Sequence, residues 1–284
     1  MFPTFIRAYP PSQPASDRAY WLPFLKNEVL VAQHGEQVAL IQANNQEMQA
    51  LLKPQEVLYI GTFDGVPCMA CEVGVDVVIP ETWHALSLWG LFGKLDEVSY
   101  SVVGYATQLL YWRRTSHFCP VCGHVPQDEV GTWGRHCPHC GHTAYPHVTP
   151  AILALVHDGG ERMLLTHKSG WGKRYSCVAG FTEPGESLEE CVQREVYEEL
   201  GVEVTDVRYV GSQPWPFPHQ LMVGYTARYV SGAIRLEEQE LDDARWFSTD
   251  ALPEMPPPLS LAHSMIKTWV EATRQRQQDA SKNA

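Results

Sequence analysis

Apolar residues recur along the N-terminal part of the chain in patterns that predict both strands and helix. Residues 56–79 have strand-like apolar runs on both sides of Asp64-Gly65, a dipeptide typical of tight hairpin turns. Residues 87–114 are typical of helix, and Asp96 within them is a suitable cap. The pattern therefore predicts an α+β domain over residues 1–114.

From residue 148 onward, apolar runs of strand length alternate with longer stretches of helical pattern. A Gly-Gly turn separates the first two strands. The predicted strands are 151–158, 162–168 and 219–230, and the predicted helices are 187–200 and 259–275. Such alternation is typical of α/β domains, so we expect one over residues 148–274. The polar residues 275–284 are expected to form a flexible, frayed tail.

Between these regions, residues 115–147 are dense in Cys, His, Gly and Pro and offer little to a hydrophobic core. The hexamers CPVCGH (119–124) and CPHCGH (137–142) lie there. Two-residue spacing lets both thiolates of a pair reach one ion, and the following glycine permits a tight turn. We therefore expect residues 115–147 to be a zinc ribbon with a structural zinc ion. The expected ligands are Cys119, Cys122, Cys137 and Cys140.

Two alternatives for this module remain, a redox disulfide and ligation by a nearby histidine such as His124 or His142. Four thiolates already complete a tetrahedral shell and leave no open position for a substrate. The other four cysteines, Cys68, Cys71, Cys177 and Cys191, are expected to be small buried apolar residues. Positions 68 and 71 point to opposite faces of a strand, so this C-x-x-C pair is not a predicted metal site.

Length and charge narrow the class of protein. The chain has 284 residues and a formal net charge of −12. This length favours two domains with a small extra module. The acidic balance argues against a general DNA- or RNA-binding surface, because such a surface would be basic. The apolar runs are too short to span a bilayer, and the N-terminus lacks the apolar stretch of a signal peptide. We therefore expect a cytoplasmic protein that binds neither DNA nor a membrane.

The predicted helix over residues 187–200 has clear signals at both ends. Ser187 and Glu190 form a capping box, and Gly201 is suited to end the helix. Apolar residues recur along it at a spacing that makes one stripe, which should face the core. The members of this stripe are Leu188, Cys191, Val192, Val196 and Leu200.

Three glutamates interrupt the side of this helix that should face the core. At roughly 100° per residue, Glu195 and Glu199 fall inside the apolar stripe and Glu198 lies at its edge. A buried charge costs on the order of several kcal/mol unless it is compensated, and Arg194 cannot neutralise all three carboxylates. Divalent cations such as Mg²⁺ prefer carboxylate oxygens and tend to accompany phosphates. The spacing therefore predicts a metal site in preference to a solvated helix face.

A longer gapped pattern contains these glutamates. Its members are Gly180, Glu186, Arg194, Glu195, Val196, Glu198, Glu199, Gly201 and Val202. They match every specified position of the Nudix box, so this region resembles the Nudix hydrolases. The resemblance implies hydrolysis of a nucleoside diphosphate linked to another group, on an α/β/α sandwich with a mixed sheet.

The resemblance also implies Mg²⁺ or Mn²⁺ as the catalytic metal. The implied ligands are Glu195, Glu198, Glu199 and the carbonyl of Ala179, and Arg194 would orient one of the carboxylates. Divalent ions would bridge the anionic oxygens of a diphosphate, stabilise developing charge and acidify water. A carboxylate would then remove the proton, and Glu199 is one candidate for this base.

The stretch SQPWPFP at 212–218 narrows the resemblance. It resembles the signature that separates NADH pyrophosphatases (NudC-type) from other Nudix hydrolases. The order of N-terminal domain, four-cysteine ribbon and Nudix domain agrees with that family over nearly the whole chain. The resemblance implies hydrolysis of NAD(H) to AMP and nicotinamide mononucleotide, and removal of NAD caps from RNA 5′ ends.

The family resemblance also assigns residues that contact the substrate. Phe181 would stack on the nicotinamide, and Tyr145 would line the same pocket. Glu240 would help to bind the metal, and Ala262 would offer a backbone contact to the substrate. The signature loop comprises Gln213, Pro214, Trp215, Pro216, Phe217, Pro218, His219 and Gln220.

The three prolines of this stretch exclude a helix interior or a central strand, so a rigid loop is predicted. Trp215 is the best candidate for stacking on the substrate, because a rigid indole loses little entropy. For Phe217 and the prolines, plain hydrophobic packing is the alternative. Gln220 stands where the family usually has serine, so a polar contact there would differ. The resemblance further implies a homodimer in which this loop reaches the neighbouring subunit's site.

Two other functions are compatible with these patterns. A Nudix hydrolase with this domain order could act mainly on ADP-ribose or on dinucleoside polyphosphates. A zinc-ribbon regulator could use a Nudix fold only to bind a ligand. Such a regulator is expected to have lost acids of the box, and none is lost here.

Overall fold

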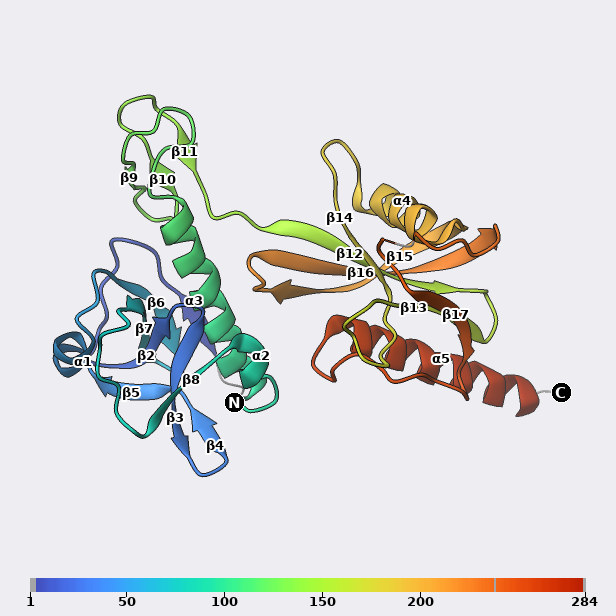
Figure 1. Cartoon of the computed structure of the whole chain (residues 1–284), viewed down its shortest axis with the longest axis horizontal. Coiled ribbons are helices and arrows are strands. Elements are labelled where there is room, and N and C mark those ends of the chain that lie inside the picture. Colours follow the sequence, from blue (N-terminus) through green and yellow to red (C-terminus); the bar gives the residue numbers. More distant parts are fainter. Residues whose placement is uncertain (1–3, 238, 283–284) are drawn as a thin grey trace. The chain divides into compact units, whose positions relative to one another are not determined.

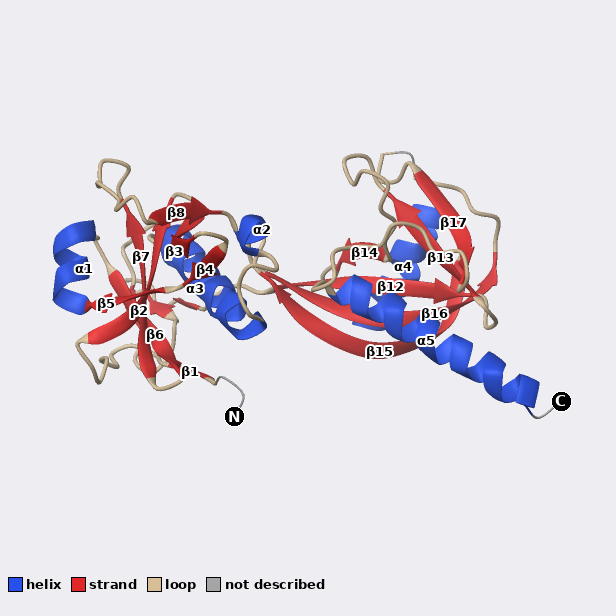
Figure 2. Cartoon of the chain, turned by 90° about the horizontal axis from the view of Figure 1, so that it is seen from below, coloured by secondary structure: helices blue, strands red, loops and turns tan. Residues whose placement is uncertain are grey.

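The structure of the chain is a computed structural model that describes residues 4–237 and 239–282. The chain divides into two compact units, Met1–His147 and Val148–Ala284, and each has sheets of its own (Figures 1 and 2). Among the described residues, every helix is too short or too polar to pass through a membrane.

The N-terminal unit is built on an eight-stranded sheet of order β1-β6-β7-β2-β3-β4, in which β5 also pairs with β2 and β8 with β3. Its elements are β1 (Phe5–Arg7), β2 (Arg18–Leu25), β3 (Glu28–His34), β4 (Gln37–Ala39), β5 (Ile41–Asn44), α1 (Asn45–Leu52), β6 (Val57–Phe63), β7 (Val66–Val73) and β8 (Trp83–Leu86). The hairpin between β6 and β7 turns at Asp64 and Gly65, whose φ angles are 49° and 78°. This confirms the predicted turn.

Four cysteines outside the ribbon are buried, as predicted. Cys68 and Cys71 lie on β7, and Cys177 and Cys191 lie in the C-terminal unit. Burial raises the pKa of Cys68 and Cys71 to about 12, so both thiols stay protonated at neutral pH. They act as small apolar residues in the sheet.

The stretch 87–114, which we predicted as helical, contains two helices, α2 (Leu88–Leu91) and α3 (Glu97–Thr115). Asp96 caps α3, because its carboxylate accepts hydrogen bonds from the first-turn backbone N–H groups. Gly93, with φ of 76°, lies in the break between the helices. This backbone conformation suits glycine and ends α2.

The cysteine-rich segment contains a small three-stranded sheet that belongs to the N-terminal unit. Its strands are β9 (Gln127–Asp128), β10 (Arg135–His136) and β11 (Thr143–Ala144). The indole Nε1 of Trp112 on α3 donates to the Trp133 carbonyl oxygen at 2.7 Å, and Trp133 Nε1 donates to the Tyr105 hydroxyl at 2.9 Å. These buried contacts fix the segment against α3.

The C-terminal unit is an α/β/α sandwich. Its elements are β12 (Thr149–His157), β13 (Arg162–His167), β14 (Val178–Phe181), α4 (Leu188–Leu200), β15 (Glu203–Trp215), β16 (Gln220–Ser231), β17 (Asp243–Ser248) and α5 (Leu261–Lys282). Ile152 and Ala154 of β12 belong to the core cluster of α4, whereas Leu153 and Leu155 belong to that of α5. The two helices therefore cover opposite faces of the sheet (Figure 1).

The sheet of this unit is mixed, with order β15-β16-β12-β13-β17 and β14 also paired to β12. The β12–β16 pair is parallel, and the other pairs are antiparallel. The predicted fold class is confirmed.

The end of the chain differs from the prediction. We expected residues 275–284 to be a frayed tail, but α5 continues to Lys282. These residues are rich in Gln, Arg, Ala and Lys, which are good helix formers, and extending an existing helix needs no new nucleus. Residues 283 and 284 lie outside the described residues.

The stretch 212–220 also differs from the rigid loop that we predicted. Residues 212–215 form the end of β15, residues 216–219 form a turn, and Gln220 begins β16. Prolines are compatible with this strand because β15 lies at the edge of the sheet. A missing N–H on the outer side of an edge strand removes no ladder bond.

Candidate functional site

The site begins on β14, next to the strand at the centre of the sheet. Gly180 pairs with Ile152 of β12. A β-carbon at Gly180 would overlap the carboxylate of Glu195, so glycine is what lets this carboxylate lie against the backbone. Ala179, the adjacent residue on β14, is exposed.

Helix α4 has the ends and the buried face that its sequence predicts. The Ser187 hydroxyl accepts from the Glu190 N–H at 3.2 Å, and the Glu190 carboxylate accepts from the Ser187 N–H at 2.7 Å. Gly201 ends the helix with φ of 68°. Glu199 is buried together with four of the five apolar residues of the stripe, which are Cys191, Val192, Val196 and Leu200.

Arg194 joins the box residues into one network. Its guanidinium forms a bidentate pair with Glu186, at 2.6 and 2.9 Å. It also donates to Glu195 at 2.8 Å, to Glu198 at 3.0 Å and to the Phe181 carbonyl at 2.8 Å. Hydrogen bonds from Arg194 lower the pKa of Glu186 to about 2. Arg194 therefore holds Glu195 and Glu198 on the same side of α4.

Glu199 is a buried carboxylate without enough partners. It is 8% exposed, and among the described residues its Oε2 has no hydrogen-bond partner. Burial raises the pKa of Glu199 to about 8, and the charges of Glu195 and Glu240 add to this shift. Burial also raises the pKa of Glu195. A cation beside these oxygens would compensate the lost hydration, so the group fits a divalent metal ion.

Backbone hydrogen bonds fix Glu240 near the C-terminal end of α4. The N–H of Glu240 donates to the Glu237 carbonyl at 2.9 Å, and the Glu237 N–H donates to the Glu199 carbonyl at 3.0 Å. On the other side, the Asp242 N–H donates to the His167 carbonyl at 3.0 Å. The turn that carries Glu240 is thus tied both to α4 and to the end of β13.

The acidic side chains of this region are held by cations of the chain itself. Glu240 forms an ion pair with Lys168 Nζ at 2.7 Å, while Arg194 takes oxygens of Glu195 and Glu198. Within residues 4–237 and 239–282, no three acidic side chains bring a carboxylate oxygen each within 4.8 Å of one another. Metal binding would therefore draw these carboxylates closer together.

The proline-rich hairpin contacts the start of α5. The Gln213 amide donates to the Leu259 carbonyl and accepts from the Leu261 N–H, both at 2.8 Å. A β-carbon at Gly224 would lie 2.5 Å from the sulfur of Met265, so α5 lies close to the strand at this point. These contacts hold the first turn of α5, which carries the buried Ala262, against the hairpin.

The polar end of the hairpin is bonded internally. His219 Nδ1 lies 3.1 Å from the Thr149 hydroxyl, and the Thr149 N–H donates to the His219 carbonyl at 2.9 Å. Gln220 pairs with Trp215 across the strands. The amide of Gln213 and the ring of His219 thus have partners in the fold, whereas the sequence assigned both residues to the substrate.

The aromatic residues of the predicted substrate pocket are partly exposed. Trp215 is half-buried, and its ring centroid lies 5.2 Å from that of Phe217 at an angle of 58°. Phe181 is 50% exposed, and Tyr145, in the N-terminal unit, is 54% exposed. Pro216 is buried, whereas Pro214 and Pro218 are exposed.

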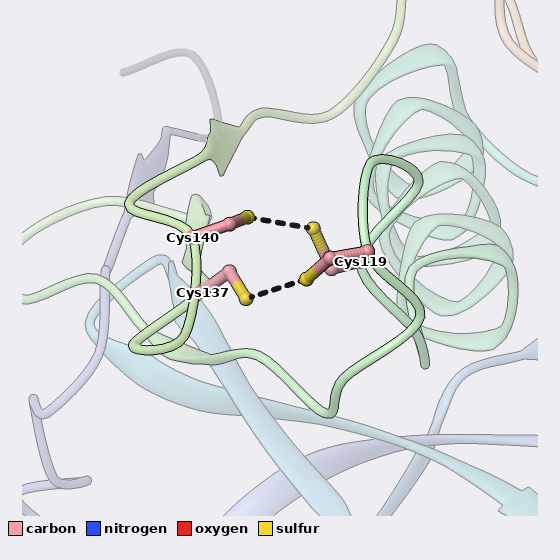
Figure 3. A group of neighbouring side chains, drawn as sticks. Cys119, Cys137 and Cys140 are labelled. Atoms are coloured by element: carbon pink, nitrogen blue, oxygen red, sulfur yellow. Dashed lines mark hydrogen bonds between the residues drawn. The ribbon is translucent and has the colours of Figure 1, made fainter.

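The four ribbon cysteines gather around one point (Figure 3). Cys119 Sγ lies 3.6 Å from Cys140 Sγ, and Cys122 Sγ lies 3.5 Å from Cys137 Sγ. All four sulfurs lie within 4.8 Å of one another. Zn–S bonds of about 2.3 Å in a tetrahedron place sulfurs roughly 3.8 Å apart, so the group fits a structural zinc ion.

Each hexamer forms the same tight turn. The Cys119 N–H donates to the His124 carbonyl and the Cys137 N–H to the His142 carbonyl, both at 2.8 Å. Gly123 and Gly141 have φ angles of 76° and 77°, a conformation that favours glycine. The repeat in the sequence is therefore a repeat in the structure.

Histidines near the ribbon offer a weaker ligand set. The rings of His124 and His139 stack with centroids 3.7 Å apart and planes at 8°, and both lie close to Cys122. The lone pair of an imidazole lies in its ring plane, so two parallel rings do not converge on one ion. The four cysteines therefore make the better shell.

Sequence reasoning assigned no role to Glu186 or Lys168. Glu186 precedes the helix cap, so helical spacing does not place it next to Arg194. Its membership of the box was the available signal. Lys168 meets Glu240 across 72 positions of sequence, and no local pattern marks such a pair.

Three family models match successive parts of the chain. Residues 18–112 match the NADH pyrophosphatase-like rudimentary NUDIX domain, residues 114–145 match the NADH pyrophosphatase zinc ribbon domain, and residues 147–270 match the NUDIX domain.

Curated proteins similar to the chain include two bacterial enzymes. The chain is 41% identical over 212 residues to the NAD-capped RNA hydrolase NudC of Pseudomonas aeruginosa (strain LESB58), covering 74% of this chain and 76% of that protein. Identity is 41% over 214 residues to the NAD-capped RNA hydrolase NudC of Pseudomonas putida (strain W619), with the same coverage. A NUDIX hydrolase structure from Nitrosomonas europaea aligns with a TM-score of 0.45 at 20% identity, covering 56% of this chain and 92% of that one.

Proposed function

Because this chain belongs to the Nudix hydrolases, in the family of the NudC NAD-capped RNA hydrolases, we propose that it cleaves the diphosphate bond of NAD(H). The products are AMP and nicotinamide mononucleotide, and NAD caps at RNA 5′ ends are further substrates. The observation that carries this proposal is the buried Glu199 carboxylate, which lies among other acids on the box helix with an oxygen left unpartnered.

The proposed holder of the catalytic metal is the acidic group around α4. Its members are Glu195, Glu198, Glu199, Glu240 and the carbonyl of Ala179. Mg²⁺ or Mn²⁺ bound there supplies charge for the diphosphate oxygens and acidifies water. Arg194, anchored by its bidentate pair with Glu186, keeps Glu195 and Glu198 oriented toward the group. The two carboxylates are thus held on one side of α4 before a metal ion would draw the acidic group together.

We assign the general base to Glu199. Burial raises the pKa of Glu199 in the metal-free protein, and a carboxylate whose pKa is raised is a stronger base than an ordinary one. The unpartnered Oε2 is the atom that would accept the proton of the attacking water. Glu199 is one of the buried residues of α4, and this burial limits the access of other water to the oxygen.

The dinucleotide would be held by partly exposed aromatic rings. Phe181, which follows the box glycine, is proposed to stack on the nicotinamide, and Tyr145 and Trp215 are proposed to contribute further stacking surfaces. The backbone at Ala262 would contact the substrate at the start of α5. Gln220 would provide a polar contact where related proteins have serine.

We further propose that the protein is a cytoplasmic homodimer, that it prefers Mg²⁺ or Mn²⁺ as its catalytic metal, and that it does not bind DNA. In the proposed homodimer, the proline-rich hairpin would reach the site of the neighbouring subunit.

The test is a comparison of substrates with the purified enzyme. Hydrolysis of NADH, NAD⁺, an NAD-capped RNA, ADP-ribose and a dinucleoside polyphosphate is followed with Mg²⁺ and with Mn²⁺. We expect kcat/KM for NADH or for the capped RNA to exceed that for ADP-ribose. A much faster reaction of ADP-ribose or of the dinucleoside polyphosphate would favour the alternative substrates instead.

A further inference from the structure

Backbone hydrogen bonds fix the segments that carry Lys168 and Glu240 next to each other. Lys168 follows β13 directly, and the His167 carbonyl accepts the Asp242 N–H at 3.0 Å. Strands β13 and β17 are also paired at His167 and Asp243. The two segments are therefore locked together, and the contact between Lys168 and Glu240 is set by the fold.

The ion pair itself is close but easily displaced. Lys168 Nζ lies 2.7 Å from Glu240 Oε2, and the two side chains are 45% and 53% exposed. Exposed ion pairs of this kind add little stability. A ligand with a higher charge can therefore take the Glu240 oxygen at small cost.

The partner of Lys168 is one of the carboxylates that would hold a metal ion. Glu240 is fixed near the C-terminal end of α4, because its N–H donates to the Glu237 carbonyl at 2.9 Å and the Glu237 N–H donates to the Glu199 carbonyl at 3.0 Å. Arg194 is bonded on the other side of the group to Glu186, Glu195 and Glu198.

We propose that Lys168 is a built-in competitor of the catalytic metal ion: it occupies Glu240 in the metal-free enzyme and has to be displaced before a divalent ion binds there. The inference rests on the proposed metal site. It makes Lys168 a positioning residue that sets the metal concentration at which the enzyme becomes active. The Lys168 ammonium at Glu240 Oε2 repels a metal ion that approaches the same carboxylate, because both carry positive charge.

The experiment is a titration of the full-length protein with Mn²⁺ in the absence of substrate. Free Mn²⁺ is measured by electron paramagnetic resonance at pH 8.5, for wild type and for Lys168→Met. We expect Lys168→Met to bind Mn²⁺ about fivefold more tightly, since it removes a like charge from the site. Lys168→Arg keeps the charge and is expected to bind like wild type.

Two further variants serve as controls. Lys173→Met removes an exposed lysine of the same loop and is expected to leave Mn²⁺ affinity unchanged, which excludes a general effect of net charge. In the Glu240→Gln background, Lys168→Met is expected to lose most of its effect, because the competition requires the Glu240 carboxylate. Circular dichroism spectra check that each variant is folded.

The outcomes separate this inference from the proposed function. Equal or weaker Mn²⁺ binding by Lys168→Met, in a protein whose wild type binds Mn²⁺, overturns the role of Lys168 and leaves the metal site intact. A raised KM for NADH with unchanged Mn²⁺ affinity would instead make Lys168 a substrate ligand, which also contradicts the proposal. Failure of wild type to bind Mn²⁺ would overturn the metal site itself.

Discussion

At the scale of single residues, Glu199 is expected to destabilise the metal-free protein, and it is also the proposed general base of the reaction. Its carboxyl is buried on the apolar side of α4, and burial raises its pKa to about 8 from the ordinary value of 4.5. A carboxyl group whose pKa is strongly shifted by its surroundings is typical of active sites.

The raised pKa of Glu199 predicts how the stability of the metal-free protein depends on pH. Between about pH 4.5 and pH 8 the folded protein holds a proton on Glu199 that the unfolded chain releases. The contribution of this group to the unfolding free energy therefore falls as the pH rises through this window. Glu199→Gln removes that dependence, so we expect it to raise the melting temperature of the metal-free protein at pH 8 by a few degrees.

Melting curves of wild type and Glu199→Gln at pH 5 and pH 8, with and without Mn²⁺, provide the measurement. The two proteins should differ more at pH 8 than at pH 5. Mn²⁺ should stabilise wild type more than the variant. A variant that melts below wild type at pH 8 without metal would show that the carboxylate is stabilising, contrary to this account.

Gly180 gives a second prediction at this scale. A methyl group there would overlap the carboxylate of Glu195, so Gly180→Ala is expected to displace that carboxylate and to lower kcat about 100-fold. The matched control is Gly211→Ala, where a β-carbon would lie 3.7 Å from Leu261, an ordinary contact. Steady-state hydrolysis of NADH is the assay. Near-normal kcat in Gly180→Ala would mean that the position of Glu195 is not critical.

At the scale of elements, Gln213 links the proline-rich hairpin to α5. Its amide makes two hydrogen bonds to the backbone before and at the start of the helix. We expect Gln213→Ala to lower the unfolding free energy by roughly 1–3 kcal/mol and to raise KM for NADH several-fold with little change in kcat. The reason is that this contact holds the start of α5, where the backbone at Ala262 is proposed to contact the substrate, and leaves the acidic group untouched.

Denaturant unfolding and hydrogen exchange at residues 259–263 test this prediction. Exchange there should be faster in Gln213→Ala than in wild type. Ser212→Ala changes the neighbouring exposed residue and is expected to behave like wild type. A large fall in kcat with unchanged KM would place Gln213 in the chemical step instead.

The sequence signals that predict α4 all lie within the helix and at its ends. The segments that surround α4 in the fold have no comparable local signal. The capping box, the apolar stripe and Gly201 all lie within one helix, so the sequence predicted its ends and its buried face. The same periodicity placed Glu195 and Glu199 on that face, and in the structure Glu199 is buried whereas Glu195 is half-buried. The hairpin at 212–220 was predicted as a loop because prolines are rare in strands. They are compatible with an edge strand, but the edge position of β15 follows from the whole sheet and not from this stretch.

The parts of the site that the sequence did not predict depend on contacts between segments that are distant along the chain. The bidentate pair of Arg194 with Glu186 crosses the helix start, and the pair of Lys168 with Glu240 joins two turns. Such contacts follow from tertiary packing, which the period of one element does not encode. The family resemblance supplied Glu240 as a site residue, but spacing alone would not have found it.

At the scale of the whole molecule, the zinc ribbon gives a prediction about stability. Its sulfurs are arranged for one ion, and Trp112 and Trp133 bury its attachment to α3. Metal release leaves four thiols with little apolar core around them, so we expect residues 115–147 to lose their structure. Chelation should then make this segment sensitive to limited proteolysis and should change tryptophan fluorescence, while the C-terminal unit stays resistant.

Mass spectrometry of the fragments locates the cleavage sites, and Cys122→Ser provides a variant that loses the shell without chelator. Re-addition of Zn²⁺ should restore resistance in wild type but not in the variant. An unchanged proteolysis pattern after complete zinc removal would show that the ribbon folds without its metal.

The central claim is metal-dependent hydrolysis of the NAD(H) diphosphate bond by the acidic group of α4. The most direct measurement is the release of AMP and reduced nicotinamide mononucleotide from NADH by wild type and Glu199→Gln, at saturating Mn²⁺ and after metal removal. We predict turnover by wild type only with metal, and a loss of about 100-fold or more in Glu199→Gln. Metal-independent turnover, or a near-normal rate in Glu199→Gln, would contradict this account.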